Sequence, residues 1–178
     1  MKPSEIVLPI GGVYASRQPM VVKTLLGSCI AVCLHDRIAA VGGMNHFMLP
    51  SGGSAGEDSG RFGVHAMDLL IGAIMKAGGD RRRFGAKVFG GANVLDIGGT
   101  AGDIGRQNIE FIETFLRDEG IPLLNADVGG TVARQVHFHT KTGRAFVKRV
   151  ARVRPDLLAE ERRQRSAPAA YGRITLFE

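Results

Sequence analysis

Two runs of apolar and β-branched residues, 20–26 (MVVKTLL) and 29–35 (CIAVCLH), form the clearest pattern near the N-terminus. In the second run alternate residues would face opposite sides of a sheet, which predicts a strand. The run 38–49 (IAAVGGMNHFML) follows after a turn at Asp36-Arg37. It predicts a returning strand that pairs with 29–35 as a hairpin.

Apolar residues return with a helical period in two longer segments, 64–77 and 105–118. This spacing is typical of amphipathic helices that bury one face, and glycines follow both segments. The residues expected to face the core are Met67, Leu70, Ile71 and Ile74 in the first helix and Ile109, Ile112, Phe115 and Leu116 in the second. The segment 51–60 (SGGSAGEDSG) is predicted to be a flexible loop.

Four further strands are predicted at 86–90, 121–128, 132–140 and 144–150. The resulting order, β-β-β-α-β-α-β-β-β, is not the regular alternation of a βαβ fold. It indicates an α+β fold, with largely antiparallel β layers and two main helices packed on them.

The composition changes after residue 150, where arginine and alanine become frequent and the apolar periodicity fades. We therefore divide the chain into one domain at 1–150 and a basic C-terminal tail at 151–178, partly disordered, with one short helix near 155–165. No apolar window is long enough to span a membrane, and no secretion signal is evident. The expectation is a cytoplasmic protein that does not insert into membranes.

The net charge of +6 and the sequence pI of 9.8 favour an acidic partner. The chain has no Trp and only two Tyr, which is few for a protein that stacks nucleic-acid bases. We read the run Arg81-Arg82-Arg83 as a solvated face and predict no nucleic-acid partner.

The two cysteines, Cys29 and Cys33, share one predicted strand. Their Cα atoms would then lie about 13 Å apart, well beyond the roughly 7 Å that a disulfide allows, so the thiols are predicted to be free. Cys29 directly follows Gly27-Ser28, and a tight turn there would expose a side chain and aim backbone N–H groups at the same point. Thiol acyl chemistry requires this combination of nucleophile and oxyanion donors.

A thiol with an ordinary pKa needs a base, and His46 is the best candidate. If the two hairpin strands pair around Asp36-Arg37, residues whose numbers sum to about 73–75 lie opposite each other, which brings His46 within reach of Cys29. A third group should orient the imidazole. Thr24 offers a hydroxyl, whereas Asn45 points to the other side of a regular strand.

Less specific interpretations compete with this one. A buried cysteine is usually an inert apolar residue, and a histidine among apolar residues is often structural. His137 and His139 form an H-x-H pattern that would suit a metal, but no carboxylate lies nearby in sequence, so we predict no metal and no other cofactor. The glycine-rich segments 90–93 and 127–130 match no phosphate-binding loop and are predicted to be tight backbone near the rim of the site.

Two adjacent stretches, 24–36 (TLLGSCIAVCLHD) and 42–50 (GGMNHFMLP), resemble the CheD family of chemoreceptor glutamine deamidases. The resemblance extends over roughly residues 5–150 and includes the segments AMDLL (66–70), AKVFGGANVL (86–95), IGRQN (104–108), ADVGG (126–130) and RQVHFHTKTGRAFVK (134–148).

The resemblance implies that residues 1–150 form a deamidase domain that converts particular receptor glutamines to glutamate. It implies Cys29 as nucleophile, His46 as general base and acid, and a third member to which both Lys23 and Thr24 can be aligned. We choose Thr24, because its hydroxyl has the appropriate chemistry. The oxyanion or substrate is expected to contact Ser28, Gly27 and Asn45.

The implied partners are the cytoplasmic helices of chemoreceptors and a CheC-type phosphatase. The main alternative function is that of a non-catalytic chemotaxis adaptor, which binds receptors or such a phosphatase. An adaptor would tolerate Cys29→Ala, whereas a deamidase would not.

Overall fold

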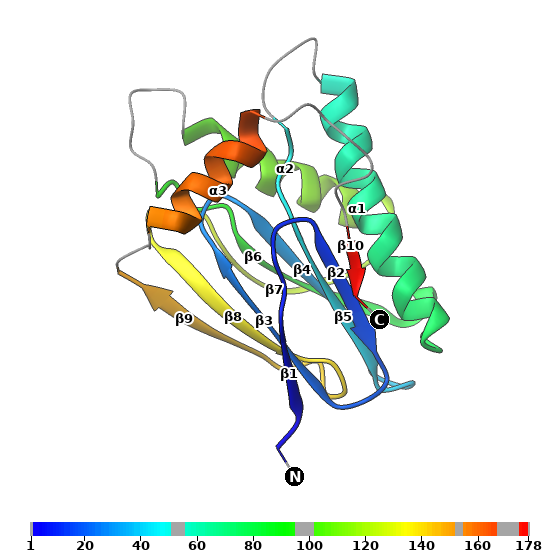
Figure 1. The fold of residues 1–178 in the computed structure, drawn as a ribbon. Coiled ribbons are helices and arrows are strands. Elements are labelled where there is room, and N and C mark those ends of the chain that lie inside the picture. The colour runs from blue at the N-terminus through cyan, green and yellow to red at the C-terminus, as the bar shows by residue number, and fades with distance from the viewer. Residues whose placement is uncertain (1, 51–55, 95–101, 152–154, 167–174, 178) are drawn as a thin grey trace.

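The computed structural model describes residues 2–50, 56–94, 102–151, 155–166 and 175–177. Its strands form two sheets that lie face to face (Figure 1). The four-stranded sheet has the order β1 (Ser4–Val7), β3 (Met20–Leu26), β8 (Ala133–His139) and β9 (Ala145–Val150). The six-stranded sheet has the order β10 (Thr175–Phe177), β2 (Gly12–Ser16), β5 (Val41–Phe47), β4 (Ile30–Asp36), β6 (Phe84–Gly90) and β7 (Leu123–Val128).

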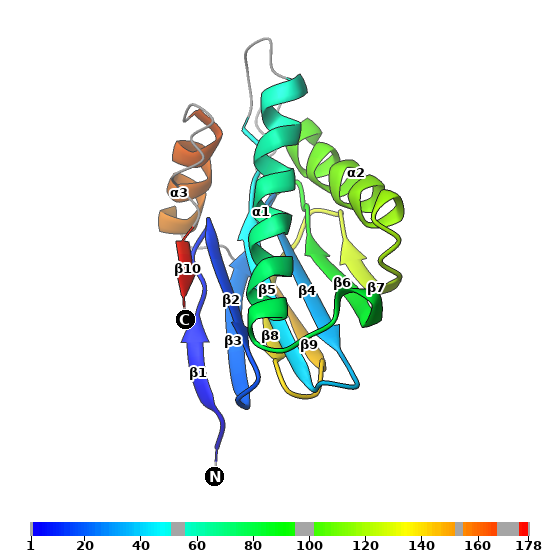
Figure 2. The same cartoon turned by 90° about the vertical axis from the view of Figure 1, so that its right-hand side faces the viewer.

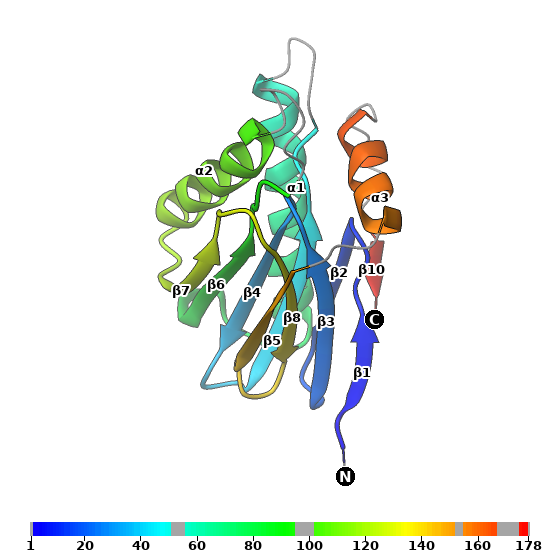
Figure 3. The ribbon, with the colours of Figure 1, turned by 90° about the vertical axis from the view of Figure 1, so that its left-hand side faces the viewer.

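Two long helices, α1 (Gly56–Lys76) and α2 (Gly102–Asp118), cover the outer face of the six-stranded sheet (Figure 2). The eight residues predicted to face the core do so, and Ile109 is the one that stays partly exposed. A short 3-10 helix (Arg81–Arg83) leads into β6, and a third helix, α3 (Pro155–Ser166), lies at one end of the sheets (Figure 3).

The central strands β4 and β5 of the six-stranded sheet are buried on both faces, and this explains why β4 reads as an almost continuous apolar run. One face of β4 contributes Ile30, Val32 and Leu34 to the core beneath α1 and α2. The other face carries Cys29, Ala31 and Cys33 into a second core between the two sheets. Side-chain alternation therefore assigns the cysteines to the layer between the sheets.

The α+β fold and the two packed helices are confirmed, and most strand pairs are antiparallel. Three pairs are parallel: β1 with β3, β10 with β2, and β6 with β7. The predicted strands at 20–26, 29–35, 38–49, 86–90, 121–128, 132–140 and 144–150 correspond to β3, β4, β5, β6, β7, β8 and β9. Strands β1, β2 and β10 were not predicted, because each has five residues or fewer, which is too short for a clear alternation.

The first helix is longer than predicted, since α1 begins at Gly56 rather than near residue 64. Its first turns are rich in Gly, Asp and Ser, a composition that resembles a loop when no tertiary contact is considered. The prediction of a flexible loop at 51–60 is thus wrong for 56–60, and residues 51–55 lie outside the described part.

The C-terminal tail contains the predicted short helix, α3, and a strand, β10, that pairs in parallel with β2. Both elements contact the rest of the chain. The tail was predicted to be partly disordered, and its residues other than 151, 155–166 and 175–177 lie outside the described part.

Candidate active site

The turn Gly27-Ser28-Cys29 carries the chain from the four-stranded sheet to the six-stranded sheet. It follows the last residue of β3 and precedes the first residue of β4, so Cys29 stands at the end of the layer between the sheets. Both cysteines are free, as predicted, and Cys29 is fully buried.

Backbone hydrogen bonds from a glycine-rich segment hold this turn. The N–H of Gly91 donates to the carbonyl of Cys29 (2.8 Å), and the N–H of Ala92 donates to that of Gly27 (2.9 Å). Gly90 and Gly91 have φ angles of 109° and 66°, which favour glycine. A Cβ at Gly90 would lie 2.1 Å from the Cys29 carbonyl oxygen, so only glycine permits this approach.

Asn108 of α2 fixes the turn from the other side. Its Nδ2 donates to the carbonyl of Ser28 (2.8 Å), and its Oδ1 accepts from the N–H of Leu49 (3.0 Å). Asn108 is fully buried. One amide therefore joins the segment before the nucleophile to the segment that follows His46.

His46 lies on β5, directly opposite Ala31 of β4. Opposite residues of an antiparallel pair share a face, so His46 and Cys29 lie on the same face of the sheet, as diagonal neighbours. The numbers of paired residues sum to 77, as for Ile30 and Phe47, rather than to 73–75. The prediction of register was wrong because the turn spans residues 37–40 and not Asp36-Arg37 alone.

Thr24 reaches His46 from the opposite sheet. It shares a face of β3 with the buried Val22 and Leu26, and its Oγ1 lies 2.8 Å from Nδ1 of His46. The Thr24 hydroxyl donates to the carbonyl of Leu8 (2.8 Å), so its oxygen accepts a hydrogen bond from Nδ1–H of His46. This arrangement assigns the proton to Nδ1 and leaves a lone pair on Nε2.

Nε2 of His46 is buried and has no hydrogen-bond partner among the described residues. Burial also lowers the pKa of His46 to about 4, so that the imidazole is neutral near pH 7. A neutral imidazole with a free Nε2 can accept a proton. The pKa of the Cys29 thiol is raised, first by burial and then by the charge of Glu161 and a hydrogen bond with it.

Glu161 of α3 fills the space in front of the turn. Its Oε1 accepts from the N–H of Gly27 (3.0 Å), and its Oε2 accepts from the hydroxyl and N–H of Ser28 (3.0 and 3.4 Å). The Glu161 side chain is fully buried. The groups predicted to contact an oxyanion or substrate, Gly27 and Ser28, thus contact a carboxylate.

Two other predicted residues lie elsewhere. Asn45 faces α1, where its Nδ2 donates to the carbonyl of Ala66 and its Oδ1 accepts from the N–H of Val32. The prediction that Asn45 contacts the oxyanion or substrate is therefore wrong, because strand alternation turns its side chain to the face opposite His46. Lys23 also points away from the site, since its Nζ pairs with Glu5 on the surface.

The alternative nucleophile, Cys33, and the histidines considered as metal ligands do not join Cys29 and His46 in one site. Cys33 is packed in the layer between the sheets, and burial raises the pKa of its thiol. His139 packs edge-on against Phe146, with ring centroids 5.4 Å apart. Among the described residues, no group of three or more His, Cys, Asp or Glu side chains is arranged to hold a metal.

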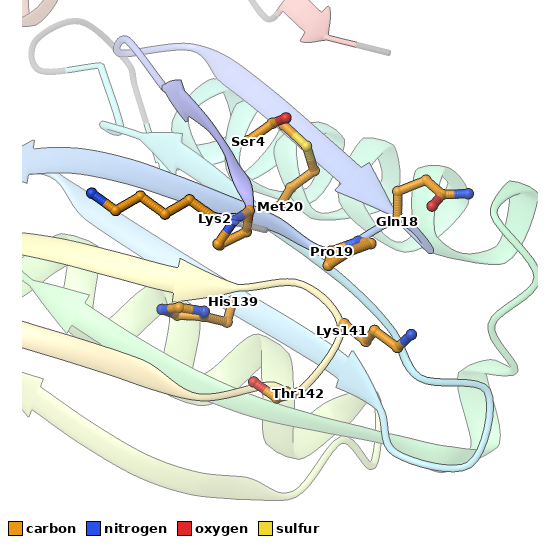
Figure 4. Close-up of a pocket in the computed structure, with 9 residues that line it drawn as sticks. Lys2, Ser4, Gln18, Pro19, Met20, His139, Lys141 and Thr142 are labelled. Atoms are coloured by element: carbon orange, nitrogen blue, oxygen red, sulfur yellow. The ribbon is translucent and has the colours of Figure 1, made fainter.

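An open pocket of about 420 Å³ lies at the far end of β3 (Figure 4). Met20, Gln18 and His139 are among the residues that line it. Met20 is six residues before Leu26, which corresponds to about 20 Å along a strand. The pocket is thus remote from Cys29, whose own surroundings are filled by Glu161.

Sequence reasoning did not single out Asn108 or Glu161. Asn108 falls in the IGRQN motif. It lies four residues before Ile112, on the helix face predicted to be buried, and a polar residue at such a position was a usable signal. Glu161 follows Cys29 by more than a hundred residues in a polar helix, and no local pattern connects the two.

Comparison with known proteins places these residues in a family. Residues 48–149 match the family model described as CheD chemotactic sensory transduction. A Ruegeria protein named "Probable chemoreceptor glutamine deamidase CheD 1" is 46% identical, with 98% of this chain and 96% of that protein covered. A Chromobacterium violaceum protein, "Probable chemoreceptor glutamine deamidase CheD 2", is 48% identical over 79% of this chain and 71% of that protein.

A solved structure of the Neisseria meningitidis protein NMB0706 aligns with a TM-score of 0.41 and 11% identity, over 72% of this chain and 63% of that one. No helix among the described residues is long and apolar enough to cross a membrane. The family-model match and the extensive identity to curated relatives show that this chain belongs to the CheD family.

Proposed function

We propose that the chain hydrolyses the side-chain amide of particular glutamines on chemoreceptors, giving glutamate and ammonia. The names of its relatives supply the substrate class. The observation that carries the mechanism is the hydrogen bond between Thr24 and Nδ1 of His46, which leaves a free Nε2 on the face of the sheet that carries Cys29.

In this mechanism Nε2 of His46 takes the thiol proton, and the Cys29 sulfur bonds to the amide carbon. The N–H groups of Gly27 and Ser28 donate hydrogen bonds to the oxygen, which becomes negatively charged. His46 then returns its proton to the amide nitrogen, the C–N bond breaks and ammonia leaves a thioester. His46 next takes a proton from water, hydroxide attacks the thioester, and glutamate departs as the thiol reforms.

Thr24 acts as the positioning residue in this scheme, because it sets the tautomer of His46 through an oxygen that already donates to Leu8. Because of this contact with His46, we prefer Thr24 to Lys23 as the third member of the proposed catalytic group. A general base of this kind typically accounts for about 10²–10⁴-fold in rate.

In this proposal the substrate is a helix of the receptor's cytoplasmic part, and the protein acts in the cytoplasm. A CheC-type phosphatase remains part of the proposal as a second partner. The basic surface, with a net charge of +6, suits acidic partners of either kind.

Peptide mass spectrometry of a receptor cytoplasmic domain tests the function. Wild type and Cys33→Ala should convert glutamine to glutamate, and Cys29→Ala should not. Conversion that persists in Cys29→Ala would exclude Cys29 as nucleophile. Unchanged glutamine with wild-type protein, together with retained receptor binding, would favour the adaptor alternative.

A further inference from the structure

The side chain that fills the candidate active site has the chemistry of the proposed product. Glu161 presents a side-chain carboxylate from a helix, and the proposed reaction yields a glutamate side chain on a receptor helix. Its two oxygens contact the N–H groups of Gly27 and Ser28. A substrate amide oxygen would have to contact these same groups during attack by Cys29.

The Glu161 carboxylate packs closely against the turn that precedes Cys29. A Cβ added at Gly27 would lie 2.5 Å from Oε1 of Glu161, so the carboxylate rests directly on the backbone of the turn. The hydroxyl of Ser28 donates a further hydrogen bond to Oε2 (3.0 Å). Glu161 appears in none of the ion pairs between described residues, so its hydrogen-bond donors are the N–H groups of the turn, the Ser28 hydroxyl and the Cys29 thiol.

One side chain of α3 is inserted more deeply than the other α3 side chains that the structure describes. Among the α3 side chains that the structure describes, Glu161 alone is buried, Leu158 is half-buried, and Ala159, Arg162 and Arg163 are exposed. Glu161 is therefore the described α3 side chain that inserts most deeply into the domain. Further along the chain, the strand β10 pairs with β2.

We propose that α3 is a built-in product mimic, in which Glu161 closes the active site until a receptor helix displaces it. This inference rests on the proposed function for the identity of the competing helix. It also specifies the form of the substrate as a side chain that projects from a helix, because a helix is what the site holds here. The C-terminal tail then regulates access to Cys29.

The negative charge of Glu161 also affects the reactivity of Cys29. The Glu161 carboxylate opposes ionisation of the Cys29 thiol and contributes to the rise in its pKa. A glutamine side chain is neutral and would not oppose the thiolate. Exchange of α3 for a substrate helix therefore uncovers the nucleophile and removes a negative charge that suppresses it.

The rate at which a small alkylating reagent modifies Cys29 tests the closure without any receptor. Glu161→Ala should raise this rate at least about tenfold over wild type, since one charge-assisted hydrogen bond accounts for a factor of that size. Glu160→Ala removes a negative charge of the same helix that acts more weakly on Cys29 and makes no hydrogen bond to it, so it should raise the rate much less than Glu161→Ala. Equal rates for Glu161→Ala and wild type would overturn the inference.

A second experiment uses Glu161→Gln to place a carboxamide in the site. The thiol of Cys29 should attack it, release ammonia and leave glutamate after hydrolysis, which peptide mass spectrometry detects at position 161. The change should be absent in Glu161→Gln combined with Cys29→Ala, and Glu160→Gln should keep its glutamine. Failure of conversion at position 161 in a variant that deamidates receptor would mean that α3 does not present its side chain as a substrate does.

Receptor deamidation by wild type, measured in parallel, separates the two hypotheses. If wild type deamidates receptor and Glu161→Ala reacts no faster with the reagent, the proposed function stands and the α3 inference fails. If Glu161→Ala exposes Cys29 but neither protein deamidates receptor, closure by α3 stands and the proposed function fails.

Discussion

Thr24 Oγ1 and His46 Nδ1 lie 2.8 Å apart, although the two residues belong to different sheets. The contact crosses the layer between the sheets and is shielded from water on both sides, since both residues are buried. A hydrogen bond in such surroundings is directional and is expensive to break. It makes the packing of one sheet on the other a condition for the reactivity of the imidazole.

Replacement of Thr24 tests this relationship. Thr24→Val keeps the shape but removes the hydroxyl, so His46 loses the partner that sets its tautomer. We expect kcat for receptor deamidation to fall about tenfold or more, the equivalent of one net hydrogen bond. Thr24→Ser keeps the hydroxyl and should retain most of the activity. Equal kcat values for the Val and Ser variants would contradict a positioning role.

The pH dependence of stability should reveal the burial of His46. Its folded pKa of about 4 lies below the ordinary value of 6.5, so the unfolded chain binds the proton more tightly. The stabilising contribution is complete above about pH 6.5 and is lost as the pH falls towards 4, amounting to about 3 kcal/mol. Urea unfolding of wild type and His46→Asn across this range measures it. A wild-type slope no steeper than that of the variant would show that the imidazole titrates normally.

Asn108 should matter for stability and for catalysis. Asn108→Ala leaves the Ser28 carbonyl and the Leu49 N–H without partners in a buried place, which costs about 3 kcal/mol. We also expect a lower kcat for the remaining folded protein, because the segment before Cys29 loses an anchor. Glu113→Ala on the exposed side of α2 is the matched control. Thermal unfolding together with deamidation rates at a temperature where both variants are folded distinguishes the two effects.

Two glycine variants separate backbone strain from steric clash. Gly90→Ala and Gly120→Ala both place a Cβ at a positive φ, of 109° and 66°. At Gly120 nothing lies within 4 Å of that Cβ, whereas at Gly90 the Cys29 carbonyl oxygen is 2.1 Å away. Gly120→Ala should cost about 1–2 kcal/mol with normal activity. Gly90→Ala should cost more and should also slow deamidation and Cys29 alkylation.

Equal losses in these two glycine variants would indicate that the contact between Gly90 and Cys29 relaxes without consequence. Urea unfolding gives the stabilities, and activity per folded molecule gives the catalytic effect.

Much of the fold could be predicted because its signals are local. Alternation in 20–26 and 29–35 predicts strands, and a helical period around Met67 and Ile112 predicts α1 and α2, since side-chain spacing is a property of each segment alone. The parallel strands β1 and β10 escaped prediction because four and three residues are too few to show an alternation. The hairpin of β4 and β5 was found, but its register shifted with the length of the turn.

The sequence by itself determined the chemical groups of this protein: a cysteine after Gly-Ser at the start of a strand, and a histidine on the strand that returns beside it. Only the tertiary structure decided that Thr24 rather than Asn45 supports His46, because the facing sheet supplies the partner and strand alternation turns Asn45 away. It also decided that Glu161 lies against Gly27 and Ser28. Contacts between residues far apart in the chain depend on how whole elements pack, and no local spacing encodes them.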